Sequence, residues 1–371
     1  MCPSRRASAS LSFVLQACMP SITGWYDPTP RGGALRLAAH SYLAGTRDPG
    51  LSLPGLRRGD LVVLEDGRVR SVNGLPPENL AARPDFASLG AVHPARVLRL
   101  ETPRASSART ADIQRAVDLV CPFGFGQRAL IVSPPKAGKT VMLQAVAEGV
   151  ALGHPDAELL LLLIDERPEE VSELLDWGRG EVIASSFDLP HARHVAVAEM
   201  VFEHARRQVE IGRDVVIVLD SLTRLARSHN TAGRSVGRTM TGGLDAAALA
   251  KPKALFGAAR AVPAGGSLTV IATALDQTGS RMDDVIFEEF KGTGNAELRL
   301  SRELADRRLY PAVDISASGT RREELLGEPA EVAGRNALRR RLAGLPPAQA
   351  VEMMLALMRR SKTNSELLAS L

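Results

Sequence analysis

The sequence predicts an α/β fold in which helices cover a parallel β-sheet, with a small β-domain before the sheet and a helical segment after it. Four continuous apolar runs, at residues 129–132, 159–164, 215–219 and 268–275, each end in a polar residue and alternate with helical stretches. Strands that are apolar along their whole length are buried on both faces, which is typical of a parallel sheet between two helical layers.

The regions on either side of these runs predict the domain organisation. Between residues 25 and 101, short apolar stretches are separated by turns rich in glycine, proline and aspartate, which predicts a small β-barrel or sandwich. We expect residues 1–24 to be a disordered tail, although two arginines before a short apolar stretch imitate an export signal. Residues 102–111 are polar and predict a linker, and residues 112–371 predict the parallel-sheet domain with its C-terminal helices.

Composition excludes several classes of protein. The chain has 371 residues, of which 45% are hydrophobic, enough for two or three domains with packed cores. No stretch reaches the roughly 18–20 uninterrupted apolar residues that a bilayer crossing needs, so we expect no membrane contact. The three cysteines, Cys2, Cys18 and Cys121, form neither a disulfide framework nor a metal motif, which fits a reducing, cytoplasmic location.

Charge is distributed unevenly along the chain. Residues 1–130 carry 16 Arg, no Lys and 10 acidic residues, whereas the remainder carries 30 basic and 32 acidic residues. A basic amino-terminal third is compatible with a polyanionic partner such as nucleic acid. Because the whole chain holds 40 Arg and only 6 Lys, an arginine-rich coding background explains the same charge equally well.

A phosphate-binding loop is predicted at residues 133–140 (SPPKAGKT), between an apolar run and a helical stretch. Gly138 lets the backbone wrap around phosphates, and the amide groups at the start of the helix attract the anion. Lys139 supplies a positive charge to the β and γ phosphates, and Thr140 offers a hydroxyl to Mg²⁺. Ser133 replaces the first glycine of the motif. We therefore expect ATP and Mg²⁺ as cofactors.

Carboxylates follow two of the predicted strands. Asp220 comes directly after the third apolar run, where we expect it to hold Mg²⁺ together with Thr140. Asp165 and Glu166 follow the second run, where a carboxylate is expected to orient or deprotonate the attacking water. The alternative for Glu166 is a helix-capping acid without a catalytic role.

Six motifs occur in one order at fixed intervals, and together they resemble the bacterial transcription termination factor Rho family, ring-shaped RNA-dependent ATPases of the RecA-like class. The resemblance runs from about residue 112 to residue 326. The motifs are 164–171 (IDERPEEV), 220–230 (DSLTRLARSHN), 255–260 (LFGAAR), 265–275 (GGSLTVIATAL), 287–295 (FEEFKGTGN) and 318–326 (SGTRREELL).

The resemblance implies roles for individual residues at the nucleotide site. Glu166 matches the catalytic glutamate, Asp220 the magnesium aspartate and Arg224 a neighbouring sensor of the γ phosphate. Arg321 matches an arginine finger that reaches into the adjacent subunit of a homohexamer, and Lys139 completes the catalytic set. The residues implied in ATP binding are Gly124, Gly126, Gln127, Arg128, Lys136, Ala137, Gly138, Lys139, Thr140, Val141, Arg167 and Tyr310, the last by stacking on adenine.

The same resemblance implies an ATP-dependent RNA translocase that terminates transcription, with single-stranded RNA and the RNA polymerase elongation complex as partners. Two segments are expected to line a central RNA channel. The residues implied in gripping RNA are Arg238, Thr239 and Thr241 in GRTMTGG, and Lys291, Gly292, Thr293 and Gly294 in FKGTGN. These glycine-rich segments favour a nucleic-acid pore over a rotary or export-type ATPase that uses a related ring.

The amino-terminal region departs from the family pattern, which has a cold-shock-type OB barrel that catches single-stranded RNA. The strand expected to carry stacking aromatics, residues 31–37 (RGGALRL), has none, so we expect a degenerate OB-like RNA-binding domain. Arginines 31, 36, 57 and 58 would bind phosphates instead, whereas Trp25, Tyr26 and Tyr42 are expected in the core. A regulatory RNA-binding paralogue without termination activity is the alternative function.

Overall fold

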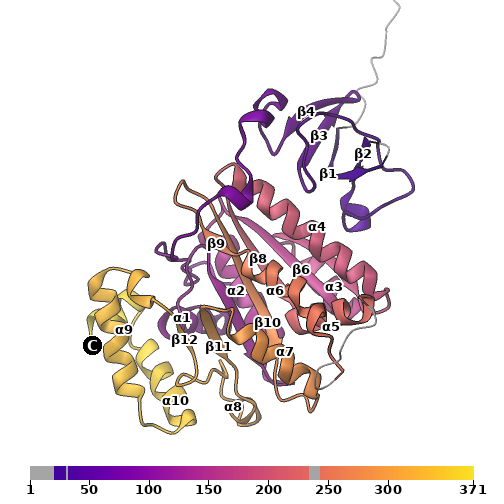
Figure 1. Cartoon of the computed structure of the whole chain (residues 1–371). Helices are drawn as coiled ribbons and strands as arrows, with labels where there is room; N and C mark the ends of the chain where they lie inside the picture. Colours follow the sequence, from indigo (N-terminus) through magenta and orange to yellow (C-terminus); the bar gives the residue numbers. More distant parts are fainter. Residues whose placement is uncertain (1–20, 31, 234–242) are drawn as a thin grey trace, which may run out of the picture.

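The computed structural model describes residues 21–30, 32–233 and 243–371 and contains two β-sheets (Figure 1). The smaller sheet is antiparallel, with strand order β2-β1-β3-β4, and lies at one end of the molecule above α4. Its first strand begins at Ile22, so residues 22–24, which were expected to belong to a disordered tail, are part of this strand. The strands are β1 (Ile22–Thr29), β2 (Gly32–Arg36), β3 (Leu61–Glu65) and β4 (Arg68–Val72).

The larger sheet confirms the predicted parallel architecture. Its strand order is β12-β11-β5-β10-β8-β6-β7, and β9 pairs with β10. All neighbours from β11 to β7 are parallel, whereas β9 and β12 add short antiparallel pairs. The strands are β5 (Arg128–Ser133), β6 (Glu158–Glu166), β7 (Glu181–Ser186), β8 (Asp214–Asp220), β9 (Arg260–Ala261), β10 (Ser267–Leu275), β11 (Ala296–Arg299) and β12 (Gly319–Thr320).

Helices cover both faces of this sheet. Successive strand residues point to opposite faces, so Ile131 and Leu161 pack with α1 and α2, whereas Leu130 and Leu160 pack with α4 to α7. The C-terminal helices α9 to α11 extend the first of these layers. The helices are α1 (Ala108–Val120), α2 (Lys139–Gly153), α3 (Pro168–Trp177), α4 (His191–Glu210), α5 (Leu222–Ala232), α6 (Ala250–Gly257), α7 (Arg281–Lys291), α8 (Arg302–Asp306), α9 (Pro329–Leu342), α10 (Pro347–Met358) and α11 (Asn364–Ala369).

Capping residues set where the helices near the carboxyl edge of the sheet begin. The Ser221 side chain accepts a hydrogen bond from the backbone N–H of Arg224 (3.2 Å), so α5 starts directly after β8. Pro168 occupies the first position of α3, directly after β6. The Ser107 hydroxyl caps α1, which starts at Ala108, inside the stretch expected to be a linker. Within the described ranges, every helix is too short or too polar to cross a membrane.

Aromatic stacking joins the small sheet to α4. The Trp25 ring lies between the rings of Tyr42 and His204, with centroid separations of 3.6 Å and 4.1 Å. Trp25 is fully buried, and Tyr26 and Tyr42 are buried as well. The prediction that these three aromatic residues belong to the core is therefore confirmed, and their rings are not available for stacking on RNA bases.

A buried ion cluster reinforces the same junction. Glu210, at the end of α4, lies 3.0 Å from Arg57, 3.4 Å from Arg83 and 2.9 Å from Arg207. Its carboxylate also accepts a hydrogen bond from the backbone N–H of Phe86 (2.9 Å). The side chain of Glu210 is fully buried, and burial raises its pKa, an effect that the surrounding arginines oppose. A buried carboxylate of this kind is tolerated because it is fully paired.

We expect Glu210→Ala to lower the free energy of unfolding by about 3–5 kcal/mol, because the variant leaves buried guanidinium groups without their shared partner. Chemical denaturation of the full chain measures the change. Asp306→Ala is the matched control, since Asp306 pairs with Arg302 at 2.7 Å on an exposed surface, where such a pair contributes about 0.3–0.5 kcal/mol. Equal losses in the two variants would contradict a structural role for the buried cluster.

Candidate active site

The predicted phosphate loop lies between β5 and α2. Lys136 and Gly138 have positive φ angles (63° and 96°), so the chain turns sharply before α2 begins at Lys139. Gly138 adopts this conformation without strain because it has no Cβ. Among the described residues, no side chain caps α2, so the first amide N–H groups of the helix are left to bind an anion such as phosphate.

Lys139 is the centre of a cluster of opposite charges at the carboxyl edge of the sheet. Its Nζ lies 2.9 Å from Oε1 of Glu166 and 2.6 Å from Oδ1 of Asp220. Both acidic residues are buried, at 2% and 4% exposure. Arg224 approaches the other oxygen of Glu166 at 3.6 Å. Two cations therefore balance two carboxylates, the condition under which such groups are stable out of water.

Burial and the neighbouring charges shift the pKa values of Glu166 and Lys139. Burial raises the pKa of Glu166, and the negative charge of Asp220 raises it further, whereas Lys139 and Arg224 act in the opposite direction. Burial by itself lowers the pKa of Lys139, but the two carboxylates outweigh it and raise that pKa above its usual value. Lys139 is therefore held in its charged form, which a group that binds phosphate requires.

The structure distinguishes the two adjacent carboxylates that follow β6. The pairing of β6 with β7 shifts between Ile164 and Glu166, and Asp165 between them has a positive φ of 59°. Glu166 contacts Lys139, whereas Oδ1 of Asp165 lies 3.9 Å from Nε2 of His194. Glu166 is thus the carboxylate at the phosphate loop, which favours a catalytic role over a capping role.

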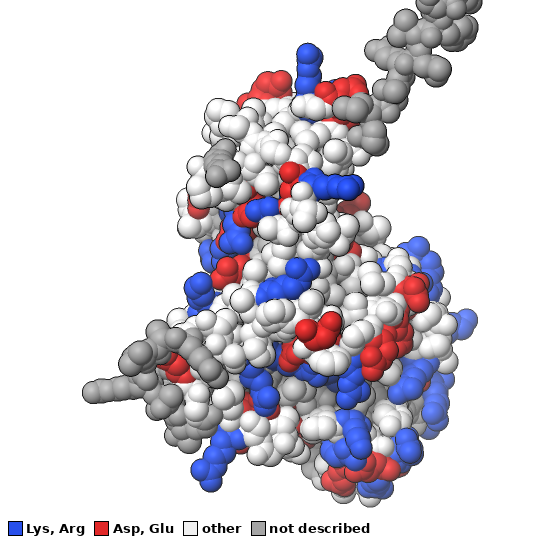
Figure 2. Space-filling model, turned by 90° about the vertical axis from the view of Figure 1, so that its right-hand side faces the viewer, with Lys and Arg blue, Asp and Glu red and all other residues white. Residues whose placement is uncertain are grey.

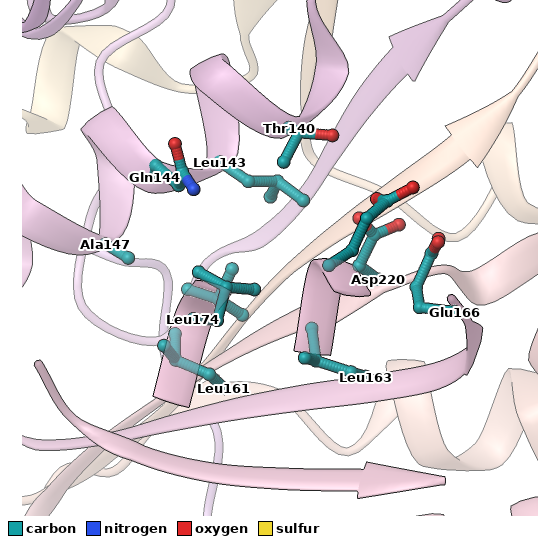
Figure 3. A pocket seen from close by; sticks show the side chains of 11 residues that line it. Thr140, Leu143, Gln144, Ala147, Leu161, Leu163, Glu166, Leu174 and Asp220 are labelled. Carbon is teal, nitrogen blue, oxygen red and sulfur yellow. The ribbon is translucent and has the colours of Figure 1, made fainter. Parts of the chain in front are cut away.

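Thr140, Glu166 and Asp220 meet at one end of a pocket whose other end is lined by leucines from β6 and α3, including Leu161 and Leu174 (Figure 3). Hydroxyl and carboxylate oxygens are ligands that suit Mg²⁺, which commonly binds one or two carboxylates and completes its shell with substrate phosphates and water. The described residues contain no cluster of three or more His, Cys, Asp or Glu that could hold a metal ion.

Thr273 contacts the candidate site, although the sequence analysis did not single it out. Its hydroxyl donates a hydrogen bond to Oδ1 of Asp220 (2.7 Å), and the residue is fully buried in β10. The bond orients the carboxylate that is predicted to hold Mg²⁺, as outer-shell partners of metal ligands do. The available signal was a threonine near the carboxyl end of the run 268–275, the second of two in that run.

Other predicted ATP-binding residues lie around the same loop. An ideal Cβ on Gly138 would be 3.9 Å from Cε1 of Tyr310, so the Tyr310 ring lies against the phosphate loop. Ala137 is buried beneath the loop and Val141 is half-buried in the first turn of α2. The Arg167 side chain is 65% exposed at the start of α3, with its guanidinium 3.8 Å from Glu170.

The turn that contains Gly124, Gly126, Gln127 and Arg128 lies at the other end of β5. Its polar groups form hydrogen bonds within the same chain. The amide of Gly126 donates to the Thr269 hydroxyl, and the Gln127 side chain donates to Asn295. The Arg128 guanidinium donates to two backbone carbonyls. The length of β5, about 20 Å at 3.3 Å per residue, separates this turn from the phosphate loop. Within one chain the two predicted ATP-binding segments do not meet.

Arg321 lies at this same amino edge of the sheet. Its backbone N–H donates to the carbonyl of Asn295 (2.8 Å) and its side chain is exposed. Lys291, Gly294 and Arg321 line one cleft here. Because the phosphate loop follows the carboxyl end of β5, this cleft cannot supply a cation to the nucleotide of its own chain.

Only one of the two segments predicted to grip RNA lies among the described residues. Lys291 is the last residue of α7, and Gly292, Thr293 and Gly294 follow it. This segment lies at the amino edge of the sheet, where the carbonyl of Thr293 accepts a hydrogen bond from Arg128 (2.9 Å). The other predicted residues, Arg238, Thr239 and Thr241, lie outside the described residues.

Three of the four arginines predicted to bind phosphates are paired with carboxylates. Arg36 lies 2.7 Å from Asp48, Arg57 lies 3.0 Å from Glu210, and Arg58 lies 3.3 Å from Asp27. Figure 2 shows blue and red side chains next to one another across one face of the molecule. Arg31, the fourth arginine predicted to bind phosphates, lies outside the described residues. The three described arginines are therefore less available to RNA than their positive charge alone suggests.

Comparison with solved structures agrees with the fold. An ATPase from the type III secretion system of pathogenic bacteria matches with a TM-score of 0.61 at 22% identity, covering 76% of this chain and 87% of that chain. An ATP synthase subunit of Nanoarcheaum equitans matches with a TM-score of 0.58 at 16% identity, covering 68% of this chain and 63% of that chain. At these identities the likeness concerns the RecA-like fold alone.

Sequence comparisons are more specific. Residues 114–320 match the family model of the ATP synthase alpha/beta family, nucleotide-binding domain. A transcription termination factor Rho of Gemmatimonas aurantiaca is 54% identical over 95% of this chain, which spans half of that protein's length. The Rho factor of Streptosporangium roseum is 49% identical over 95% of this chain and 92% of its own length, and that of Streptomyces coelicolor is 52% identical over 91% and 82%.

The similarity covers 92% and 82% of the length of the second and third of these relatives and half of the first. The secretion-system ATPase and the ATP synthase subunit described above are 22% and 16% identical to the chain. Nucleotide use follows from the matched ATPase domain. With about half of its residues identical to Rho factors over nine-tenths of its length, the chain belongs to the transcription termination factor Rho family.

Proposed function

We propose that the chain hydrolyses ATP to move along single-stranded RNA and terminates transcription by dismantling the RNA polymerase elongation complex. The observation that supports this most directly is the buried cluster of Lys139, Glu166 and Asp220 beside the phosphate loop. It combines the three elements that phosphoryl transfer needs: a cation for the phosphates, a carboxylate for Mg²⁺ and a carboxylate for water. The proposed location is the cytoplasm, where bacterial transcription takes place.

Within the proposed site each group has one task. Lys139 and the amide groups of α2 bind the β and γ phosphates, and Thr140 and Asp220 hold Mg²⁺, which would neutralise charge on the phosphate oxygens. Glu166 orients the attacking water and accepts its proton. Arg224 approaches Glu166 from α5 and senses the γ phosphate.

The positions of the cations support a ring assembly, a homohexamer by resemblance to the family. Arg321, Lys291 and Arg128 lie at the amino edge of the sheet, whereas the phosphate loop lies at the carboxyl edge. In a ring with head-to-tail contacts the amino edge of one subunit can face the carboxyl edge of the next. We propose that Arg321 completes the neighbouring site and that the turn from Gly124 to Arg128 contributes there too.

RNA is proposed to bind mainly in the central channel, through the segment from Arg238 to Thr241 and through Lys291 with its flanking glycines. The buried aromatics and paired arginines of the small β-domain leave it few groups for base stacking or phosphate binding. Stacking contributes about 1–3 kcal/mol per base, so an outer RNA site on this domain is expected to be weak.

The decisive experiment measures ATP hydrolysis by the purified full chain with and without single-stranded RNA, comparing poly(C) and poly(U) at two salt concentrations. We expect RNA to raise the rate severalfold, with little difference between the homopolymers and a steep loss of stimulation at the higher salt, because phosphate contacts dominate. A rate that is indifferent to RNA would contradict the proposed translocase. RNA binding without any hydrolysis would instead identify a regulatory paralogue.

A further inference from the structure

The ring of Tyr310, which is predicted to stack on adenine, is covered by a guanidinium group in this structure. Cζ of Arg109 lies 4.8 Å from the centroid of the Tyr310 ring. Arg109 belongs to the first turn of α1, far from Tyr310 in the sequence, and it is exposed. The Tyr310 ring is only half-buried and packs against the core that α1 and α2 share. Arg109 therefore lies over its solvent-facing side.

The contact is not explained by an ion pair. Among the residues that the structure describes, no carboxylate lies within 4.0 Å of the Arg109 guanidinium, unlike Arg99 and Arg115, which pair with Glu331 and Glu101. A guanidinium is planar and delocalised and stacks well on aromatic rings. Stacking on Tyr310 thus accounts for the position of Arg109, and a long exposed side chain remains able to move.

A base cannot fit between the two groups as they stand. Stacked planes are about 3.5 Å apart, so a base between Tyr310 and a guanidinium requires a separation of about 7 Å. The observed 4.8 Å is too short by about 2 Å. Because Tyr310 lies against the phosphate loop at Gly138, a nucleotide held by that loop brings its base to this ring. Arg109 must then withdraw, and a displacement of about 2 Å leaves it on the outer face of the base.

We propose that Arg109 is a second adenine-binding residue, which moves from its present contact with Tyr310 to clamp the base against that ring when nucleotide is bound. The inference rests on the proposed ATP site. A purine presents a larger stacking surface than a phenol ring, and the attached phosphates add an attraction for the guanidinium that Tyr310 does not supply. Both effects favour the bound position of Arg109.

The test measures ADP and UDP binding to the full chain by calorimetry in the wild type, Arg109→Ala and Arg109→Lys. We expect Arg109→Ala to raise the Kd for ADP about threefold to thirtyfold and to change the Kd for UDP less, because a pyrimidine offers less surface to stack. Arg109→Lys keeps the positive charge but has no planar guanidinium group to stack on the base, so this variant should also lose most of the preference for ADP over UDP.

Two controls separate stacking from other causes. Arg104→Ala removes an exposed arginine whose guanidinium donates to the carbonyl of Leu152 at the far end of α2, and it should leave both Kd values unchanged. Inhibition by tripolyphosphate, which has no base, should be the same in Arg109→Lys and the wild type. Unchanged or tighter ADP binding in Arg109→Ala would overturn the clamp. Wild-type protein that binds no ADP would instead contradict the proposed function, independently of Arg109.

Discussion

Glu166→Gln is expected to abolish RNA-stimulated ATP hydrolysis, lowering kcat by about 10²–10⁴-fold, while ATP binding is retained. Glutamine has the size of glutamate and keeps an oxygen that can accept the hydrogen bond from Lys139, now 2.9 Å long. The variant cannot, however, accept a proton from the attacking water. Lys139 also keeps its 2.6 Å contact with Asp220, so the phosphate loop should keep its shape.

Two measurements check this expectation: steady-state hydrolysis in the presence of RNA, and ADP or ATP binding in its absence. The matched control is Glu169→Gln, which removes the same charge three residues further along, at an exposed position in the first turn of α3. The control should hydrolyse ATP at the wild-type rate. If Glu166→Gln kept a tenth or more of wild-type kcat, Glu166 would not be the catalytic base.

The sequence predicted those parts of the fold and the site that are marked by a local sequence pattern. The apolar runs and the phosphate loop are local patterns, and they predicted β5, β6, β8 and β10 with the residues at their carboxyl ends. β7 and β11 have no continuous apolar run, because only alternate residues in them are buried. Their place in the parallel sheet follows from tertiary pairing and could not be predicted from their own composition.

The contacts that individual side chains make were harder to predict than the strands and loops on which they lie. Asp165 and Glu166 are chemically similar neighbours, and only the irregular end of β6, with its positive φ at Asp165, decides which of them contacts Lys139. Likewise, basic composition predicted phosphate-binding arginines in the amino-terminal domain, but their partners come from distant elements, such as Glu210 of α4 for Arg57. Contacts between residues far apart in the chain are set by the fold as a whole.

The sequence also did not predict at which edge of the large sheet a residue lies. The motif of Gly124 to Arg128 and the phosphate loop are neighbours in the chain, yet β5 separates them by its full length. Arg321, far away in the sequence, joins the former through Asn295, to which both segments are hydrogen-bonded. A motif that is a neighbour of the phosphate loop in the sequence therefore lies at the opposite edge of the sheet, and we propose that a neighbouring chain brings the two together.

This separation leads to the second large effect that we expect. Arg321→Ala should lower kcat by about 10³–10⁵-fold without weakening nucleotide binding to the same subunit, because the lost guanidinium stabilises the transition state in the next one. Arg322→Ala is the matched control: Arg322 is the adjacent residue, but it pairs with Glu324 at 2.5 Å on the surface. Its hydrolysis rate should stay close to that of the wild type.

Mixed assemblies test directly whether Arg321 acts on a neighbouring site. Glu166→Gln and Arg321→Ala subunits carrying different affinity tags are co-expressed, and assemblies that contain both are purified. Where a Glu166→Gln subunit presents its intact Arg321 to an Arg321→Ala subunit with intact Glu166, one complete site forms, so partial RNA-stimulated hydrolysis should return. If Arg321 served its own chain instead, every subunit would lack one essential group, and the mixed assemblies would be as inactive as either variant alone.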